Sequence, residues 1–112
     1  MALTPLLRCA DIGQTRDFYA RVLGFAVADS AQGTLTVELH GSRIVFTAGD
    51  LWKSDPTLSG TLYITVPDVD GYHAAVTALV PLAWPLQDMP YGSREFGVAD
   101  CNGYLLAFQQ QA

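Results

Sequence analysis

The sequence predicts an α+β fold made of two copies of one unit, each a strand, a helix and three further strands. The segment Cys9–Ile12 precedes one helical pattern, and Val66–Val69 precedes a second one 57 positions later (66 − 9). A later pair, Gly41–Phe46 and Gly103–Phe108, repeats at 62 positions (103 − 41). A repeat of this size indicates a fold assembled from two equivalent supersecondary units. A binding site is then expected between the units, on faces that neither unit covers alone.

Length and composition are those of one small domain with an apolar surface. The chain has 112 residues, of which 50% are hydrophobic and only 15% are charged. This predicts a single domain over 1–112, with a second subunit covering part of its surface, so we expect a homodimer. Within the domain, the first repeat is expected over about 1–48, a polar linker over 49–60 and the second repeat over about 61–112.

Charge and hydropathy argue against two classes of partner. The net charge is −5 and no basic cluster is present, so the chain would repel nucleic acid. It has no run of about 18 apolar residues that could span a membrane, and its start does not resemble a signal peptide. Two cysteines, Cys9 and Cys101, fit a reducing compartment. The expected location is therefore the cytoplasm.

The first unit can be followed element by element. Leu3–Cys9 is apolar enough for a strand. Asp11 is placed to cap the next helix, with Gln14 three positions on as in a capping box. Apolar residues then recur at helical spacing up to a stop at Gly24. Three strands follow over 25–29, 35–39 and 43–47, and the middle one alternates apolar with polar residues as a half-buried strand does.

The second unit repeats this order. A strand covers 61–66, and Asp68 is placed to cap a helix that runs to about residue 79. The strand expected over 82–86 contains Pro85, which predicts an edge or bulged strand. A final hairpin over 94–109 turns at Asn102-Gly103, a pair that favours a tight turn.

Strand periodicity predicts one apolar face under the helices and one open face on each sheet. The open face mixes apolar, hydroxyl and charged residues, which suits a cleft for a small molecule. Aromatic residues there and in the nearby loops would stack on a flat ligand. The predicted ligand-binding residues are Leu6, Arg8, Glu38, Arg43, Tyr63, Trp84, Tyr91, Glu95 and Leu105. The alternatives are that the four charged residues pair with one another, or that the face is a subunit interface or is solvated.

Two stretches resemble a known family. Cys9–Asp11 followed by Asp17–Phe25 resembles the opening of the vicinal oxygen chelate superfamily, which includes glyoxalase I, bleomycin-resistance proteins, fosfomycin-resistance proteins and extradiol dioxygenases. The stretch Tyr91–Tyr104 resembles the family's closing YG-REF…DP-GN signature, most of all in the bleomycin-resistance branch. The resemblance covers nearly the whole chain. It implies two βαβββ modules whose curved mixed sheets form a cup, with the helices on the outer face, usually completed by dimerisation.

The resemblance also implies where a metal would be bound. Metal-dependent members carry His, Gln or Glu at up to four strand positions, which correspond here to Thr4, Val45, Thr61 and Ala107. Two hydroxyls and two hydrocarbons are not a competent ligand set for a divalent ion. We therefore expect no metal, no other cofactor and no catalytic residue.

The sequence and the resemblance together predict a metal-free protein of the glyoxalase/bleomycin-resistance type. It would bind or sequester a small organic molecule, an antibiotic being one example, in the cleft of a dimer. The alternative is a superfamily enzyme (a lyase, isomerase or dioxygenase) with a non-standard site that uses Glu38 or Glu95 for acid–base chemistry. A third hypothesis is a subunit whose cup mediates association only.

Overall fold

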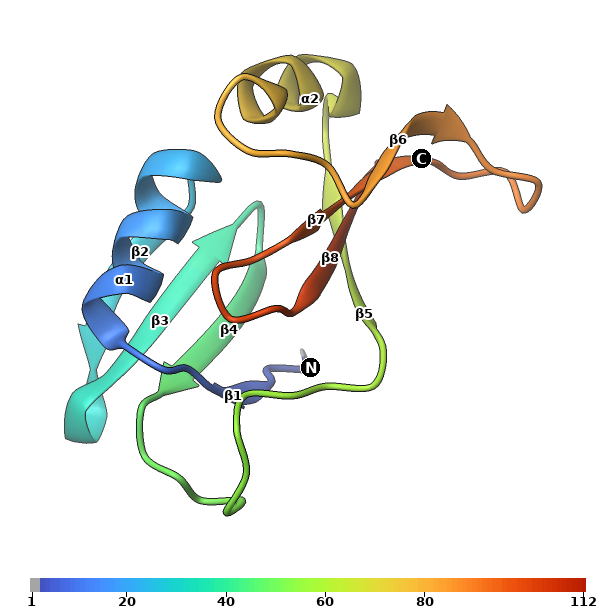
Figure 1. Cartoon of the computed structure of the whole chain (residues 1–112). Helices are drawn as coiled ribbons and strands as arrows, with labels where there is room; N and C mark the ends of the chain where they lie inside the picture. Colours follow the sequence, from blue (N-terminus) through green and yellow to red (C-terminus); the bar gives the residue numbers. More distant parts are fainter. Residues whose placement is uncertain (1–2) are drawn as a thin grey trace.

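The computed structural model describes residues 3–112, which form two βαβββ modules with one four-stranded mixed sheet each (Figure 1). The strand orders are β1-β4-β3-β2 and β5-β8-β7-β6. In each sheet the first strand of the module runs parallel to the last, and the other pairs are antiparallel. The strands are β1 (Leu6–Arg8), β2 (Ala26–Ser30), β3 (Thr34–Leu39), β4 (Ser42–Thr47), β5 (Thr61–Val66), β6 (Trp84–Asp88), β7 (Arg94–Ala99) and β8 (Leu105–Gln110). The predicted α+β fold with a repeated module is confirmed.

A helical segment follows the first strand of each module, and an aspartate caps each one as predicted. The Asp11 carboxylate accepts a hydrogen bond from the Gln14 amide at 2.7 Å and starts α1 (Ile12–Asp17). The Asp68 carboxylate accepts one from the Gly71 amide at 3.2 Å and starts α2 (Val69–Thr77). After α1 the chain continues as a π-helical turn, η1 (Phe18–Val22). No helix within residues 3–112 is both long and apolar enough to cross a membrane.

Several strand boundaries differ from the prediction, and the differences at β1, β2 and β6 have identifiable causes. The first strand is confined to β1, against an expected Leu3–Cys9, because Pro5 has no N–H to contribute to a ladder. Strand β2 begins after Phe25, whose N–H donates to the Tyr19 carbonyl at the end of the helical segment (2.8 Å). Strand β6 starts at Trp84, and its pairing with β7 shifts register between Trp84 and Gln87, around Pro85. The prediction of an edge or bulged strand there is confirmed.

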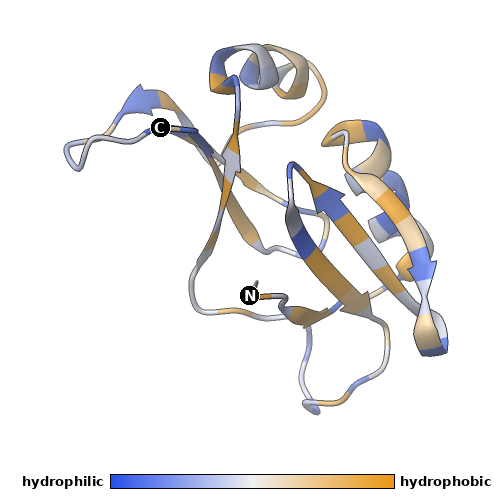
Figure 2. Ribbon diagram, turned by 180° about the vertical axis from the view of Figure 1, so that it is seen from behind, coloured by the Kyte–Doolittle hydropathy of each residue, from blue (hydrophilic) through white to orange (hydrophobic). Residues whose placement is uncertain are grey.

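The hydrophobic core lies between the two modules and joins the helix-bearing faces of both sheets. Figure 2 shows apolar and polar residues alternating along the strands of the first sheet. Tyr19 is fully buried, with its ring centroid 5.1 Å from that of Phe25 and 5.2 Å from that of Phe46. Phe25 in turn lies 6.3 Å from Phe108 of the second module. The other core residues on the strands are Leu35, Val37, Ile44, Ile64, Val66, Phe96, Val98 and Leu106.

Hydrogen bonds between the modules fix their relative position. The Tyr19 hydroxyl donates to the buried Asp100 carboxylate at 2.6 Å, and the amides of Asn102 and Tyr104 donate to the same carboxylate at 2.9 Å. Burial raises the pKa of Asp100 although these donors favour its charged form. The Tyr72 hydroxyl also crosses between modules, to the carbonyl of Leu23 at 2.5 Å. The two modules are therefore held as one packed unit.

Candidate ligand-binding site

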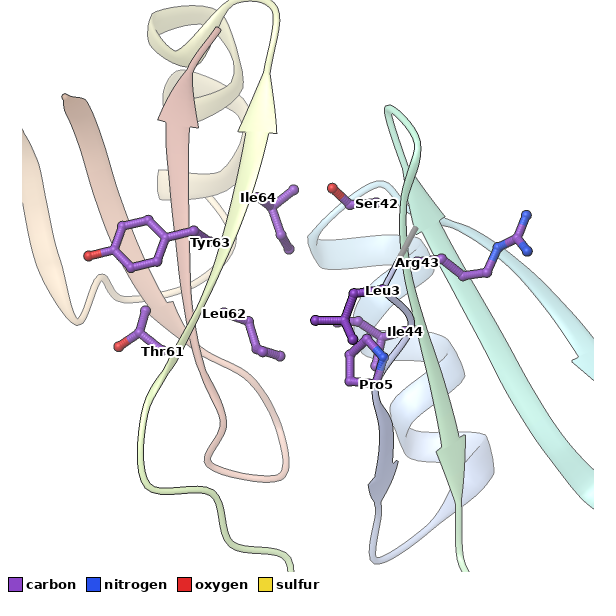
Figure 3. Close-up of a pocket in the computed structure, with 9 residues that line it drawn as sticks. All are labelled: Leu3, Pro5, Ser42, Arg43, Ile44, Thr61, Leu62, Tyr63 and Ile64. Atoms are coloured by element: carbon purple, nitrogen blue, oxygen red, sulfur yellow. The ribbon is translucent and has the colours of Figure 1, made fainter. Parts of the chain in front are cut away.

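The open faces of the two sheets point away from each other. Figure 3 shows Leu62 and Ile64 of β5 pointing toward Ile44 of β4, so these helix-side residues face one another across the gap. Tyr63 points to the outer side of the second sheet, and Arg43 points to the outer side of the first. Each sheet therefore presents its open face outward, in opposite directions. The predicted ligand-binding residues therefore divide between these two outward faces and do not form a single group within residues 3–112.

The cleft drawn in Figure 3 lies between the inner faces and not on an open face. Its volume is about 400 Å³, and the side chains that point into it are mostly apolar, such as Leu3, Leu62 and Ile64. Arg43 lines its rim but points out of it. Ligand sites combine an apolar wall with a few convergent polar groups. In this chain the polar side chains predicted to bind a ligand lie on the open faces. We therefore place the candidate site there.

The open face of the second sheet has an aromatic floor. Cross-strand register places Tyr63 beside Ala107, Ala107 beside Gly97 and Gly97 beside Trp84. The Trp84 ring lies directly over Gly97, because a Cβ added at that glycine would come within 2.4 Å of the ring. Tyr63 stands at the other end of this row with 51% of its surface exposed. The indole N–H of Trp84 is buried and has no hydrogen-bond acceptor among residues 3–112.

A buried carboxylate lies in the next row of the same face. Glu95 is opposite Gln109 on β8 and is only 1% exposed. It accepts a hydrogen bond from the Tyr91 hydroxyl at 2.6 Å, and Tyr91 itself is 61% exposed. The Glu95 carboxylate, with the Tyr63 hydroxyl, raises the pKa of Tyr91 well above its usual value, so this phenol remains a donor. The structure thus brings together four predicted residues: Tyr63, Trp84, Tyr91 and Glu95.

The open face of the first sheet is a shallower, more polar surface. Small residues, Ala26, Ala28 and Thr36, border a hollow of about 210 Å³ that ends at Glu38 and Arg43. Glu38 and Arg43 are cross-strand neighbours. Leu6 lies on the edge strand β1 and is 42% exposed.

The last two predicted residues are Arg8, which lies apart from these groups, and Leu105, which does not. Arg8 turns toward the linker, where its guanidinium donates to the Ser54 carbonyl and lies 3.9 Å from the Asp55 carboxylate. It borders a separate hollow with Trp52. Leu105 is half-buried at the start of β8, opposite Thr61 and Ala99. Leu105 is therefore on the same open face as Ala107, in the neighbouring row.

Within residues 3–112, the four predicted charged residues do not form ion pairs with one another. Among residues 3–112, the ion pairs join Arg8 to Asp55, Arg16 to Asp29, and Arg94 to Asp70 and Asp88. None of them joins Arg8 or Arg43 to Glu38 or Glu95. Glu95 is instead hydrogen-bonded to the Tyr91 hydroxyl.

Gly97 is a residue of the candidate site that the sequence analysis did not single out. A glycine inside a strand often marks the close approach of another group, so its position within the stretch 94–99 was a usable signal. The signal does not say which group approaches. That depends on the shifted register of β6, which brings Trp84 opposite Gly97.

The four positions at which the resemblance implies metal ligands do not fit a metal. Val45 belongs to the first sheet, and Thr61 and Ala107 belong to the second. Two of these residues have no donor atom, and the hydroxyls of Thr4 and Thr61 are weak neutral donors. Within the described part of the chain, no three His, Cys, Asp or Glu residues gather as they would around a metal ion.

The histidines and cysteines offer no nucleophile with a base. His40 is an exposed turn residue, and His73 on α2 packs edge-on against Phe96. Burial raises the pKa of both thiols, Cys9 and Cys101, which disfavours the reactive thiolate.

The family can be assigned from a comparison that spans nearly the whole chain. A family model described as "Glyoxalase/Bleomycin resistance protein/Dioxygenase superfamily" matches residues 3–108. The chain belongs to this superfamily. The resemblance given by the opening and closing motifs is therefore confirmed. No curated protein sequence matches this superfamily member.

Solved structures share the fold of this superfamily member at low sequence identity. A superfamily member from Sphaerobacter thermophilus has a TM-score of 0.81 at 20% identity, with 99% of this chain and 98% of that chain covered. TioX from Micromonospora sp. ML1 has a TM-score of 0.78 at 24% identity, covering 100% and 99%. Virulence protein STM3117 from Salmonella typhimurium has a TM-score of 0.77 at 19% identity, covering 100% and 97%. At these identities the similarity establishes the fold alone.

Proposed function

We propose that this superfamily member binds a small organic molecule without a metal, in clefts formed by a homodimer, and acts by sequestering it. The observation that carries this proposal is the open face of the second sheet. Exposed aromatic rings surround an apolar floor there, and one buried carboxylate provides a polar anchor. Sites for drug-sized ligands have this composition. An antibiotic is one ligand class that the family description suggests.

The outward direction of both open faces supports a cleft shared between two chains. Each face is one wall of a cleft, and residues 3–112 do not provide the opposite wall. A two-fold axis would place the first-sheet face of one copy opposite the second-sheet face of the other, producing two equal clefts. Two large side chains, the apolar Leu6 and the aromatic Tyr63, are well exposed on these faces. A second copy would cover them.

The chemistry of the four positions supports binding without a metal. A divalent ion is held by imidazole, carboxylate or thiolate groups that converge on one point. Thr4, Val45, Thr61 and Ala107 provide none of these groups. The residues of the open faces instead offer apolar contact, hydroxyls and single carboxylates, which hold an organic molecule by packing and hydrogen bonds.

Sedimentation equilibrium and metal analysis test this proposal together. Protein purified without chelator is expected to sediment at twice the chain mass and to carry divalent metal well below one ion per chain. A thermal-shift screen against drug-like molecules and metabolites should find ligands that stabilise the dimer, by about 2.7 kcal/mol at a hundred times Kd. A stoichiometric divalent ion would favour an enzyme instead. A dimer that no ligand stabilises would favour a subunit that mediates association only.

A further inference from the structure

Resting on the binding function proposed above, we propose that the ligand carries an organic cation. The cation would be a protonated or quaternary ammonium joined to an aromatic body, held by Glu95 among the rings of Tyr63, Tyr91 and Trp84. This names a ligand class for the second-sheet face. Three features of the described residues support it. They are the burial of the Glu95 carboxylate, the ion pairs that already occupy Arg94, and the aromatic side chains around Glu95.

Glu95 is buried, and no ion pair within residues 3–112 includes it. It is 1% exposed, and the Tyr91 hydroxyl is its hydrogen-bond partner within residues 3–112. A carboxylate has about four acceptor sites, so one donor leaves most of its capacity unused. Buried charges are tolerated when they are paired. A cation bound on the open face would complete this pairing.

The neighbouring arginine is not available to Glu95. Arg94 precedes it in β7 and therefore points to the opposite face of the sheet. Its guanidinium is bound to the Asp70 carboxylate at 2.8 Å and to the Asp88 carboxylate at 3.2 Å. Arg8 and Arg43 belong to the other sheet of the same chain. The net charge of −5 adds a general attraction for cations.

The side chains around Glu95 suit a cation with an aromatic body. Two exposed phenol rings, those of Tyr63 and Tyr91, lie on the same face as the Trp84 indole. Aromatic faces attract ammonium groups, most strongly when water is excluded. Gly97 lies beneath the Trp84 ring and Ala107 is fully buried, so a planar body bound on this face would meet the exposed tyrosine rings.

The test uses three probes of similar shape and different charge. They are phenyltrimethylammonium, its neutral isostere tert-butylbenzene, and the anion benzenesulfonate. Binding to the full-length protein is followed by NMR titration of the Trp84 indole signal. The background variant Trp52→Phe leaves this as the single indole, since the chain has two tryptophans. The variants are Glu95→Gln, which keeps the shape, and Asp17→Asn, which makes the same charge change on the exposed end of α1.

The expected result is that phenyltrimethylammonium shifts the Trp84 signal and binds at least about tenfold more tightly than either other probe. Glu95→Gln should weaken its binding about thirtyfold, whereas Asp17→Asn should leave it within about twofold. Binding of the neutral or anionic probe as tightly as the cation would overturn the inference and leave the binding function standing. Unchanged affinity in Glu95→Gln would also overturn the inference. An arginine of a second copy that already neutralised Glu95 would produce this result. If the cation does not bind at all the inference is wrong, and the ligand screen described above then decides the binding function separately.

Discussion

Replacing Tyr19 with alanine is expected to lower the free energy of unfolding by about 4 kcal/mol or more. The side chain is fully buried, and its ring packs against Phe25 and Phe46. Its hydroxyl also donates to Asp100 of the other module. The substitution therefore leaves a large cavity and removes a donor from a buried carboxylate. Urea denaturation followed by circular dichroism measures the change.

Tyr19→Phe separates these two contributions. It keeps the ring and removes only the hydrogen bond, so we expect a loss of about 1–3 kcal/mol. A loss below about 1 kcal/mol in Tyr19→Ala would mean that the core between the modules does not depend on this side chain. Equal losses in the two variants would assign the whole effect to the hydrogen bond.

Replacing Gly97 with leucine is expected to abolish ligand binding on the second-sheet face while the fold persists. Even a Cβ at this position would come within 2.4 Å of the Trp84 ring, so the indole must leave the floor. Overpacking of this kind costs about 1–3 kcal/mol, which a folded dimer can tolerate. Affinity for phenyltrimethylammonium, or for any ligand found by screening, should fall at least about thirtyfold.

Ala99→Leu is the matched control for this substitution. Ala99 lies on the same strand and the same face, two residues further on, and is exposed. The added side chain meets no indole there, so affinity should stay within about threefold of the wild type. Circular dichroism and sedimentation confirm that both variants fold and associate. Full affinity in a folded Gly97→Leu dimer would place the ligand elsewhere on the molecule.

Much of the fold could be predicted from the sequence because the determining interactions are local. Asp11 and Asp68 cap helices through amides three residues away, and this requires no knowledge of the rest of the chain. The alternation of apolar and polar residues along β3 predicts that Leu35 and Val37 face the core. Both are fully buried in the structure. The repeat then transfers the same arrangement to the second module.

The remaining features depend on contacts between distant segments. The bond from Tyr19 to Asp100 joins residues 81 positions apart, so no local pattern indicates it. The π-helical turn over Phe18–Val22 has no local signal, because its residues also suit a regular α-helix. The contact of Trp84 with Gly97 follows from the shifted register at Pro85. Sequence analysis could therefore name residues of the candidate site, but it could not say which of them share a face.

Complementation between two defective chains tests most directly whether one cleft combines the faces of two copies. Val45→Trp would block the first-sheet face, and Gly97→Leu would block the second-sheet face. Neither variant alone should bind. Unfolding and refolding the two variants together should form mixed dimers in which one cleft carries both blocks and the other carries neither. Binding should then return at about a quarter of the wild-type number of sites. No recovery in verified mixed dimers, or full binding by the Val45→Trp dimer alone, would contradict a cleft shared between chains.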